Sequence, residues 1–166
     1  MMKQHAFTLL ELLVTLVMIG LIVTLAAPAF AAIIDNQQRL EAAQQLASGI
    51  RTARTEAILR SRPVVIRAID RNWSNGWQIL VEPESKLENP VWMERARNGK
   101  VPIVGNGQLR QQIRFGAQGT AYGNGWVAGT LSICDGKKAQ SHHQVKLAMT
   151  GRVRIESVTK PEPLCG

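Results

Sequence analysis

The chain has 166 residues, a formal net charge of +8 and an aromatic content of only 5%. One apolar run dominates its first 34 residues, which leaves 132 residues for a folded domain. That length is enough for a single hydrophobic core and too short for two comfortable ones. The composition therefore excludes a chain of several large domains and directs attention to the apolar run and to the positive charge.

The apolar run spans residues 7–34, and Glu11 is its only charged residue. At about 1.5 Å per residue, a helix of this length measures roughly 42 Å and exceeds a bilayer hydrocarbon core of about 30 Å. An ionisable group inside such a segment is costly and usually marks a functional contact. We therefore expect a single membrane helix in which Glu11 has a specific partner.

Three interpretations of residues 1–34 explain the apolar run to different degrees. A cleaved secretory signal would use Ala29-Phe30-Ala31 as its cleavage site, but the run is about twice as long as such signals require. An uncleaved signal anchor explains the length and leaves Glu11 unexplained. Cleavage before Phe7 instead creates an α-amine about one helical turn from Glu11. An ammonium group from a neighbouring helix could then neutralise the carboxylate.

Residues 35–62 predict an amphipathic continuation of the same helix, which Pro63 ends. Apolar residues recur there at steps of three and four: Leu40, Ala43, Ala47, Ile50, Ala53 and Ala57. Together with the apolar run they predict one helix of about 55 residues, bent near Pro28. We expect the apolar stripe to pack on the protein's own sheet.

From Pro63 onward the pattern changes to short β-type segments between turn residues. Residues 63–69 and 76–82 are predicted to be neighbouring strands, with a turn around Asn72. Further strands are predicted at 112–116, 129–134, 144–149 and 151–156, whereas residues 83–110 are predicted to be mostly loop. The expected fold class is α+β, with one long N-terminal helix packed on an antiparallel sheet in the β-rich domain 63–166.

The two cysteines, Cys134 and Cys165, lie near the end of the chain. In an exported protein they are expected to form a disulfide that closes a loop of about 30 residues. Two free buried thiols are the alternative, and a metal site lacks the usual four-ligand spacing. His142 and His143 are adjacent and would point to opposite faces of a strand. We therefore predict no metal and no cofactor.

The positive charge is concentrated late in the chain. Residues 35–94 contain eight Lys and Arg against eight acidic residues, whereas residues 95–166 contain eleven against three. On a strand, Arg152 and Arg154 would project from one face about 7 Å apart, similar to successive phosphates on a nucleic-acid strand. Gly151 allows a turn directly before them. Further basic candidates are Lys137, Lys138, Lys146 and Lys160.

This arrangement predicts a face that binds a polyanion, nucleic acid or an anionic membrane surface, with a solvated basic face that only aids solubility as the alternative. Binding to nucleic acid would be independent of sequence and sensitive to salt. No serine or cysteine lies in a nucleophile motif and the acidic residues are scattered, so the sequence does not indicate an enzyme.

The beginning of the chain resembles the class III signal of type IV pilins and type II secretion pseudopilins. The resemblance rests on Lys3-Gln4-His5-Ala6-Phe7-Thr8-Leu9-Leu10-Glu11-Leu12. It implies that residues 1–6 are a leader and that a prepilin peptidase cleaves between Ala6 and Phe7 and N-methylates Phe7. It also implies that Glu11 pairs with the terminal amine of an adjacent pilin. Ala6 departs from the family, in which this residue is usually Gly.

The later part resembles the globular domains of FimT and FimU minor pilins and GspH pseudopilins, through residues 72–77, 133–135 and 150–154. In the FimT branch a Gly-Arg-x-Arg motif is associated with DNA binding during natural transformation, and it falls on Gly151, Arg152 and Arg154. The resemblance implies a minor pilin, held in the inner membrane with its domain in the periplasm and later in a pilus at the cell surface, that binds DNA for uptake. The alternative is a type II secretion pseudopilin or a pilus-priming subunit whose basic face binds protein.

Overall fold

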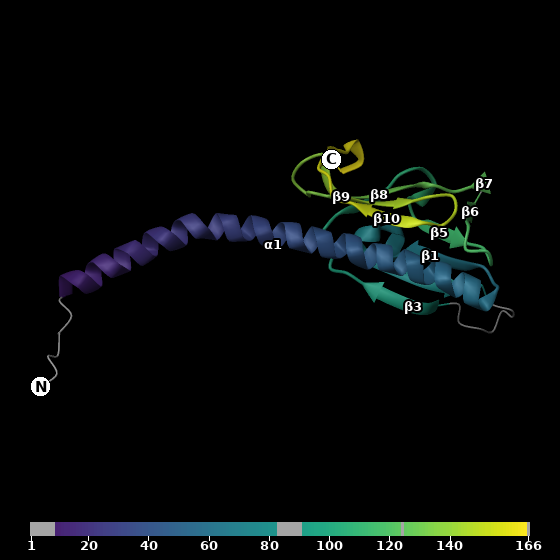
Figure 1. The fold of residues 1–166 in the computed structure, drawn as a ribbon, viewed down its shortest axis with the longest axis horizontal. Helices are drawn as coiled ribbons and strands as arrows, with labels where there is room; N and C mark the ends of the chain where they lie inside the picture. The colour runs from purple at the N-terminus through teal and green to yellow at the C-terminus, as the bar shows by residue number, and fades with distance from the viewer. Residues whose placement is uncertain (1–8, 83–90, 124, 166) are drawn as a thin grey trace, which may run out of the picture. The chain divides into compact units, whose positions relative to one another are not determined.

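The computed structural model describes residues 9–82, 91–123 and 125–165, and within them a long helix precedes a β-rich part (Figure 1). The chain divides into two compact units, Met1–Gln37 and Gln38–Gly166, which are treated separately. The predicted α+β class is confirmed, and the β-rich part forms two antiparallel sheets where one was expected.

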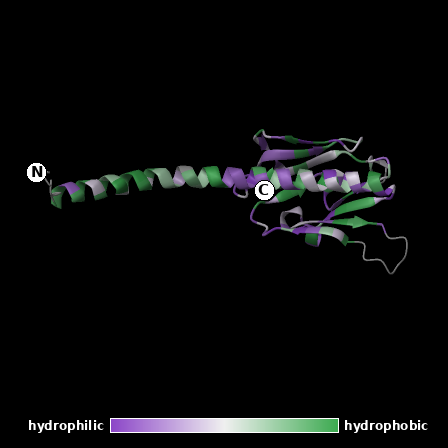
Figure 2. Ribbon diagram, turned by 60° about the horizontal axis from the view of Figure 1, so that its bottom comes forward, coloured by the Kyte–Doolittle hydropathy of each residue, from purple (hydrophilic) through white to green (hydrophobic). Residues whose placement is uncertain are grey.

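Helix α1 spans Leu9–Arg60 and crosses from the first unit into the second. In the first unit its large apolar side chains are exposed, and the hydrophobic colour predominates along this part of the helix in Figure 2. By length and composition this helix could cross a membrane. Glu11 lies in its first turn, and Pro28 lies inside it without ending it. The bend near Pro28 stays a prediction, and the cleavage site between Ala6 and Phe7 lies outside the described residues.

In the second unit, α1 carries the predicted buried stripe. Ala43, Ala47, Ile50, Ala53 and Ala57 are all fully buried. The stripe is wider than predicted because Ala42 and Leu46 are buried as well, whereas Leu40 is only half-buried. This half of the helix therefore packs on the sheets of its own unit.

The first sheet has the strand order β3-β2-β1-β5-β6-β7, with every neighbouring pair antiparallel. Its strands are β1 (Val64–Ala68), β2 (Gly76–Val81), β3 (Val91–Ala96), β5 (Gln112–Phe115), β6 (Ala121–Gly123) and β7 (Gly125–Trp126). Ile66 on β1 is opposite Ile79 on β2 and Ile113 on β5, and all three are buried. This row forms the core face of the sheet.

The second sheet has the order β10-β9-β8-β4, and β11 also pairs with β9. Its strands are β4 (Ile103–Gly105), β8 (Gly129–Cys134), β9 (Gln140–Leu147), β10 (Val153–Glu156) and β11 (Lys160–Pro161). Short 3-10 helices lie at Ile69–Arg71, Trp73–Asn75, Gly107–Leu109 and Pro163–Cys165. On the core face, Val145 of β9 is opposite Leu131 of β8 and Ile155 of β10. The helix and both sheets contribute to one core, whose described residues lie between Ala42 and Val153.

Most of the predicted strands are confirmed, but the described part of residues 83–110, which were predicted to be mostly loop, also contains two strands that were not predicted. That part contains β3 and β4. Strand β3 is an edge strand that is exposed along most of its length, so it lacks the alternation of apolar and polar residues that reveals a half-buried strand. Strand β4 has only three residues. Strand β9 also begins earlier than predicted, at Gln140, and β10 begins slightly later, at Val153.

Candidate functional site

The turn predicted before the arginine pair is present between β9 and β10. The amide of Gly151 donates to the carbonyl of Ala148 at 2.9 Å, and the amide of Ala148 donates to the carbonyl of Arg152 at 2.9 Å. Gly151 has a φ of +78°, a conformation that glycine adopts without a steric penalty. A Cβ atom at this position would lie 2.1 Å from the carbonyl oxygen of Gly119. Both the backbone angle and the close packing therefore require glycine here.

Two arginines of α1 hold this turn. Arg54 donates from Nε to the carbonyl of Gly119 at 2.8 Å and from Nη2 to the carbonyl of Thr150 at 3.2 Å. Arg51 donates from Nη2 to the carbonyl of Val153 at 3.4 Å. The sequence analysis did not identify these contacts, because nothing local links Arg54 to a carbonyl 96 residues away.

Arg152 and Arg154 lie on the same side of the chain. Both are exposed, whereas Gly151 and Val153 are buried, so the alternation begins one residue before β10. Lys146 on β9 is directly opposite Arg154. A hollow of about 440 Å³ is lined by Lys146, Arg152 and Arg154 together with Gly129, Thr130, Leu147 and Ala148. The structure thus brings together three of the predicted basic residues on the outer face of the second sheet.

Glu156 lies at the centre of this basic group. Its Oε2 is 2.7 Å from Nζ of Lys146 and 3.2 Å from Nζ of Lys160, and its Oε1 is 2.9 Å from Nη2 of Arg154. Hydrogen bonds from Lys146 and then Lys160 lower the pKa of Glu156 to about 2. The sequence analysis missed this residue, although strand alternation alone places it on the same face as Arg152 and Arg154.

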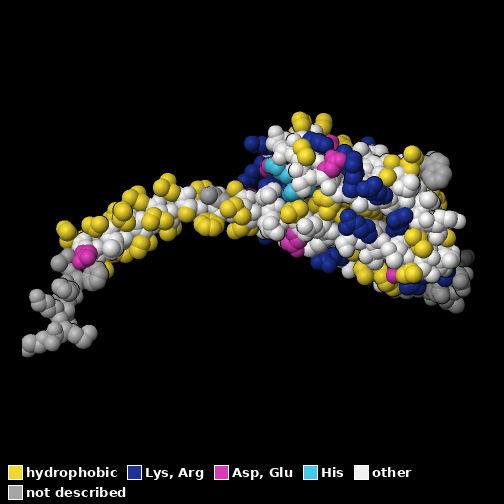
Figure 3. Space-filling view, in the orientation of Figure 1, with side chains coloured by type: hydrophobic (Ala, Val, Ile, Leu, Met, Phe, Trp, Pro, Cys, Tyr) yellow, Lys and Arg dark blue, Asp and Glu magenta, His cyan; other side chains and the backbone are white. Residues whose placement is uncertain are grey.

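Lys137 and Lys138 are exposed in the connection between β8 and β9, away from the hollow. Lys138 precedes the start of β9 at Gln140, and at about 3.3 Å per residue the six residues from Gln140 to Lys146 span roughly 20 Å. Lys160 lies between these ends, since it is opposite Ser141 on β9. Figure 3 shows one face of the molecule, on which Lys and Arg side chains gather over the second unit. We call the predicted basic residues of the second sheet and its connections the basic strip: Lys137, Lys138, Lys146, Arg152, Arg154 and Lys160.

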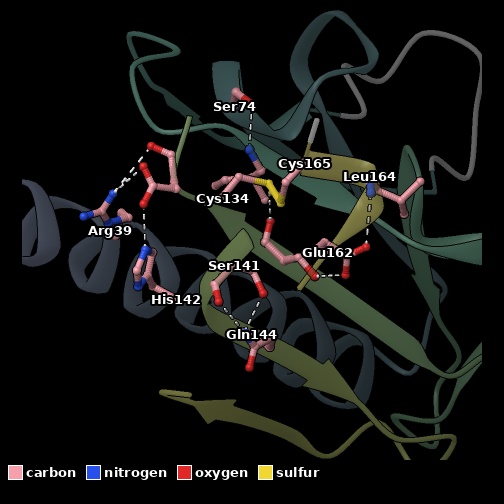
Figure 4. The surroundings of a disulfide bond; sticks show 12 residues. Arg39, Ser74, Cys134, Ser141, His142, Gln144, Glu162, Leu164 and Cys165 are labelled. Carbon is pink, nitrogen blue, oxygen red and sulfur yellow. Dashed lines mark hydrogen bonds and ion pairs between the residues drawn. A yellow bond between two sulfur atoms is a disulfide. The ribbon is translucent and has the colours of Figure 1, made fainter. Parts of the chain in front are cut away.

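A disulfide joins Cys134 at the end of β8 to Cys165, as predicted, so the alternative of two free thiols is excluded (Figure 4). The segment before Cys165 contains β11 and is fixed further by Glu162, whose Oε2 accepts a hydrogen bond from Oγ of Ser132 at 2.9 Å. Residues 160–165 therefore form a strap over β8 and β9, which places Lys160 in the basic strip.

The two histidines lie in different surroundings. His142 contacts Oδ2 of Asp135 through Nε2 at 2.9 Å, and Arg39 of α1 lies 3.6 Å from the same carboxylate (Figure 4). The hydrogen bond with His142 is the main cause of a lowered pKa at Asp135. His143 is buried, and burial followed by the charges of His142 and Arg39 lowers its pKa. Within the described ranges no three His, Cys, Asp or Glu side chains are grouped to hold a metal ion.

Comparison with known proteins agrees with this architecture. Residues 42–151 match the family described as type II transport protein GspH, and residues 1–27 match the prokaryotic N-terminal methylation motif. No curated protein matches the chain.

Two solved structures have the same fold, both of the type IV minor pilin FimU from Pseudomonas aeruginosa strain PAO1. The structure in space group P65 is 22% identical, covers 75% of this chain and 98% of its own, and has a TM-score of 0.61. The structure in space group P21 is also 22% identical, covers 77% and 96%, and has a TM-score of 0.63. With the family match over most of the second unit and the methylation motif at the front, the chain belongs to the GspH family of type IV minor pilins and pseudopilins, which are structural subunits.

Proposed function

We propose that this pilin binds extracellular DNA without sequence preference through the basic strip and so supports DNA uptake in natural transformation. The main support is that Lys146, Arg152 and Arg154 surround one hollow on the outer face of the second sheet. Neighbouring exposed cations on a strand have a spacing near that of successive phosphates. The side chain of Arg152 makes no hydrogen bond or ion pair within the described part of the chain, so its guanidinium is available to a ligand.

The strip is suited to phosphates rather than to bases. Trp73 and Trp77 are buried, and Trp92 lies on the first sheet beneath Arg60, so none of these rings can stack on a base bound at the strip. Lys and Arg side chains that neutralise phosphates release counterions, which makes binding weaken as salt rises. The expected interaction is therefore electrostatic and independent of sequence.

A direct test uses the full chain in micelles of an uncharged detergent and a fluorescent duplex of random sequence. Anisotropy titrations at several salt concentrations give the affinity and its salt dependence. We expect binding at low salt, and we expect Arg152→Gln/Arg154→Gln to weaken it at least about tenfold and to reduce the slope of log K against log salt by about two.

The matched control removes the same charge from the first sheet and its connections. Arg95 and Arg110 are both exposed there, so Arg95→Gln/Arg110→Gln lowers the net charge equally. This control should bind DNA nearly as well as the parent chain. Equal losses in the two double variants would show that only net charge matters and that the strip is not the site.

The alternative is a minor pseudopilin of a type II secretion system, or a pilus-priming subunit, that does not bind DNA. The matching family is described as type II transport protein GspH, and three cations of the strip already have a carboxylate partner. Absence of DNA binding by the parent chain at low salt would favour this alternative, in which the basic face contacts protein.

For assembly, we propose that Glu11 pairs with the terminal amine that cleavage before Phe7 creates on an adjacent pilin. The methylation motif over residues 1–27 and the position of Glu11 in the first turn of α1 support this role. Before assembly, the chain would reside in the inner membrane with its second unit in the periplasm. Glu11→Ala should leave insertion and peptidase processing intact while reducing recovery in sheared filaments; unchanged recovery would contradict the pairing.

A further inference from the structure

We propose that Glu156 is an internal competitor for the DNA backbone: its carboxylate occupies the place where a phosphate docks, and binding proceeds by exchange of one for the other. This inference rests on the proposed DNA binding and identifies the residue that limits its affinity. Two side-chain oxygens of Glu156 receive three cationic groups, from Lys146, Arg154 and Lys160.

The contacts of Glu156 have the geometry of a phosphate site. Two ammonium groups reach one oxygen at 2.7 and 3.2 Å, and a guanidinium reaches the other at 2.9 Å. A phosphodiester offers two non-bridging oxygens with the same acceptor capacity, and Lys and Arg are the side chains that bind it. A phosphate placed at this point would therefore satisfy the same three donors.

Exchange at this site should be inexpensive because all the groups are accessible to solvent. The exposed fractions of the side chains are 31% for Lys146, 59% for Arg154, 45% for Lys160 and 24% for Glu156. Ion pairs at such surfaces contribute little net stability, and long Lys and Arg side chains can swing to a new partner without moving the backbone. The low pKa of Glu156 means that mild acid does not remove the competitor.

Competition by a tethered carboxylate would also select for polymers. When a single phosphate ion displaces Glu156, the cations lose their contacts with the carboxylate and gain similar contacts with the phosphate, so the net gain is small. A nucleic-acid strand gains contacts beyond those it displaces, because Arg152, Lys137 and Lys138 have no carboxylate partner in the described part of the chain. The strip should thus discriminate against inorganic phosphate and mononucleotides and bind strands of several phosphates.

A purely supporting role makes the opposite prediction. Lys146 and Arg154 are directly opposite on β9 and β10, and like charges at such positions repel. If Glu156 only held these cations in position, its removal would disorder them and weaken DNA binding. The sign of the change in affinity therefore separates the two roles.

The test compares Glu156→Gln with the parent as full chains in uncharged micelles, using the random-sequence duplex. We expect the variant to bind roughly threefold to tenfold more tightly at about 100 mM salt, with a salt slope steeper by up to about one. Orthophosphate, added at constant ionic strength, should displace DNA from Glu156→Gln at lower concentrations than from the parent, because the vacated place can then hold a phosphate ion.

Glu94→Gln is the matched control, since it adds the same net charge on exposed strand β3 of the first sheet. It should change affinity little. Unchanged or weaker binding by Glu156→Gln, with parent binding still dependent on Arg152 and Arg154, would overturn the competitor role and leave DNA binding intact. Absence of binding by both parent and variant would instead refute the proposed function.

Thermal unfolding of each variant shows whether the second sheet is intact. If Glu156→Gln melts well below the parent, Glu156→Asp serves as a second variant. It keeps the charge and moves the carboxylate away from the cations by the length of one methylene. An affinity between those of the parent and Glu156→Gln supports competition, and an affinity below that of the parent contradicts it.

Discussion

The outer faces of the two sheets carry their cations in different ways. On the first sheet Arg67 donates to the side-chain oxygen of Gln78 through both Nε and Nη2, and Gln78 donates in turn to Glu94. Arg114 forms an ion pair with Glu82. These cations each have a polar partner of their own, spread across neighbouring strands.

On the second sheet one carboxylate serves three cations. Lys146, Arg154 and Lys160 share Glu156, so the group keeps a net positive charge, and Arg152 adds to it. The two sheets thus differ in how acidic residues are distributed among the cations, and under the proposed function this distribution sets the affinity for DNA. The concentration of positive charge late in the chain locates the basic strip only coarsely, because Arg95 lies in β3 of the first sheet and Arg110 lies just before β5 of that sheet.

The largest expected effect on stability comes from removing the disulfide, which fixes the strap and therefore belongs to the second sheet alone. Cys134→Ser/Cys165→Ser should lower the free energy of unfolding by about 3–4 kcal/mol, because the bridge no longer restricts a loop of about 30 residues in the unfolded chain. Urea unfolding of a fragment that begins at Asp35 measures it, since the described core begins later, at Ala42.

Hydrogen exchange sharpens this result. Loss of amide protection should be largest in β9 and β11, which the strap contacts, whereas β1 and β2 should lose only the protection that corresponds to the decrease in global stability. Equal loss in both sheets would show that the bridge acts only through the unfolded chain, and a change in stability below about 1 kcal/mol would contradict the predicted contribution of the bridge.

The next largest effect is expected at the turn that carries the arginine pair. Gly151→Ala should cost about 2–3 kcal/mol, because it combines a left-handed backbone with a clash against the carbonyl of Gly119. It should also weaken DNA binding by displacing Arg152. Urea unfolding and the anisotropy titration measure the two effects.

Gly107 provides the matched control for that turn. Its φ is +51°, and a Cβ atom there would have no neighbour within 4 Å. Gly107→Ala should therefore cost only the backbone strain, about 1 kcal/mol, and should leave DNA binding unchanged. If both glycine variants lost the same stability, the close packing at Gly151 would be of no consequence.

The smallest expected effect is a pH dependence that originates in the second sheet. Burial keeps the pKa of His143 below its ordinary value, and Arg39 and His142 act in the same direction. In the unfolded chain the pKa of His143 returns to its ordinary value near 6.5. The unfolded chain therefore binds more protons than the folded one, and stability falls as pH drops below that value.

His143→Gln should remove this part of the pH dependence, because the amide can still bond to Ser157 but does not titrate. Urea midpoints between about pH 7.5 and 5.5 measure it. Identical slopes in parent and variant would show that the acid sensitivity comes from another group.

Much of the fold could be predicted because its signals are local. The stripe on α1 and the strands β1, β2, β5 and β8 follow periodicity and turn residues. Strand β3 could not be predicted this way, since an exposed edge strand stabilised by pairing with β2 needs no apolar alternation. Its existence depends on tertiary contacts rather than on its own pattern.

Only part of the candidate site could likewise be predicted from the sequence. The spacing of two residues on a strand predicts that Arg152 and Arg154, which follow Gly151, share one face. The same spacing places Glu156 on that face, but only basic residues were considered there. The support from Arg51 and Arg54 could not be predicted, because it joins α1 to backbone carbonyls of Val153 and Thr150 across about a hundred residues. Long-range contacts to backbone leave no side-chain pattern in the sequence.

The contacts of Arg51 and Arg54 also have a consequence for the mechanical resistance of strand β10. A strand at the edge of a sheet, such as β10, peels most easily when it is pulled from one end. Here Arg54 donates a hydrogen bond to the carbonyl of Thr150 and Arg51 donates one to the carbonyl of Val153, on either side of Arg152. If Arg152 holds a polymer as proposed, these two contacts with α1 would resist a pull on it, in addition to the pairing of β10 with β9.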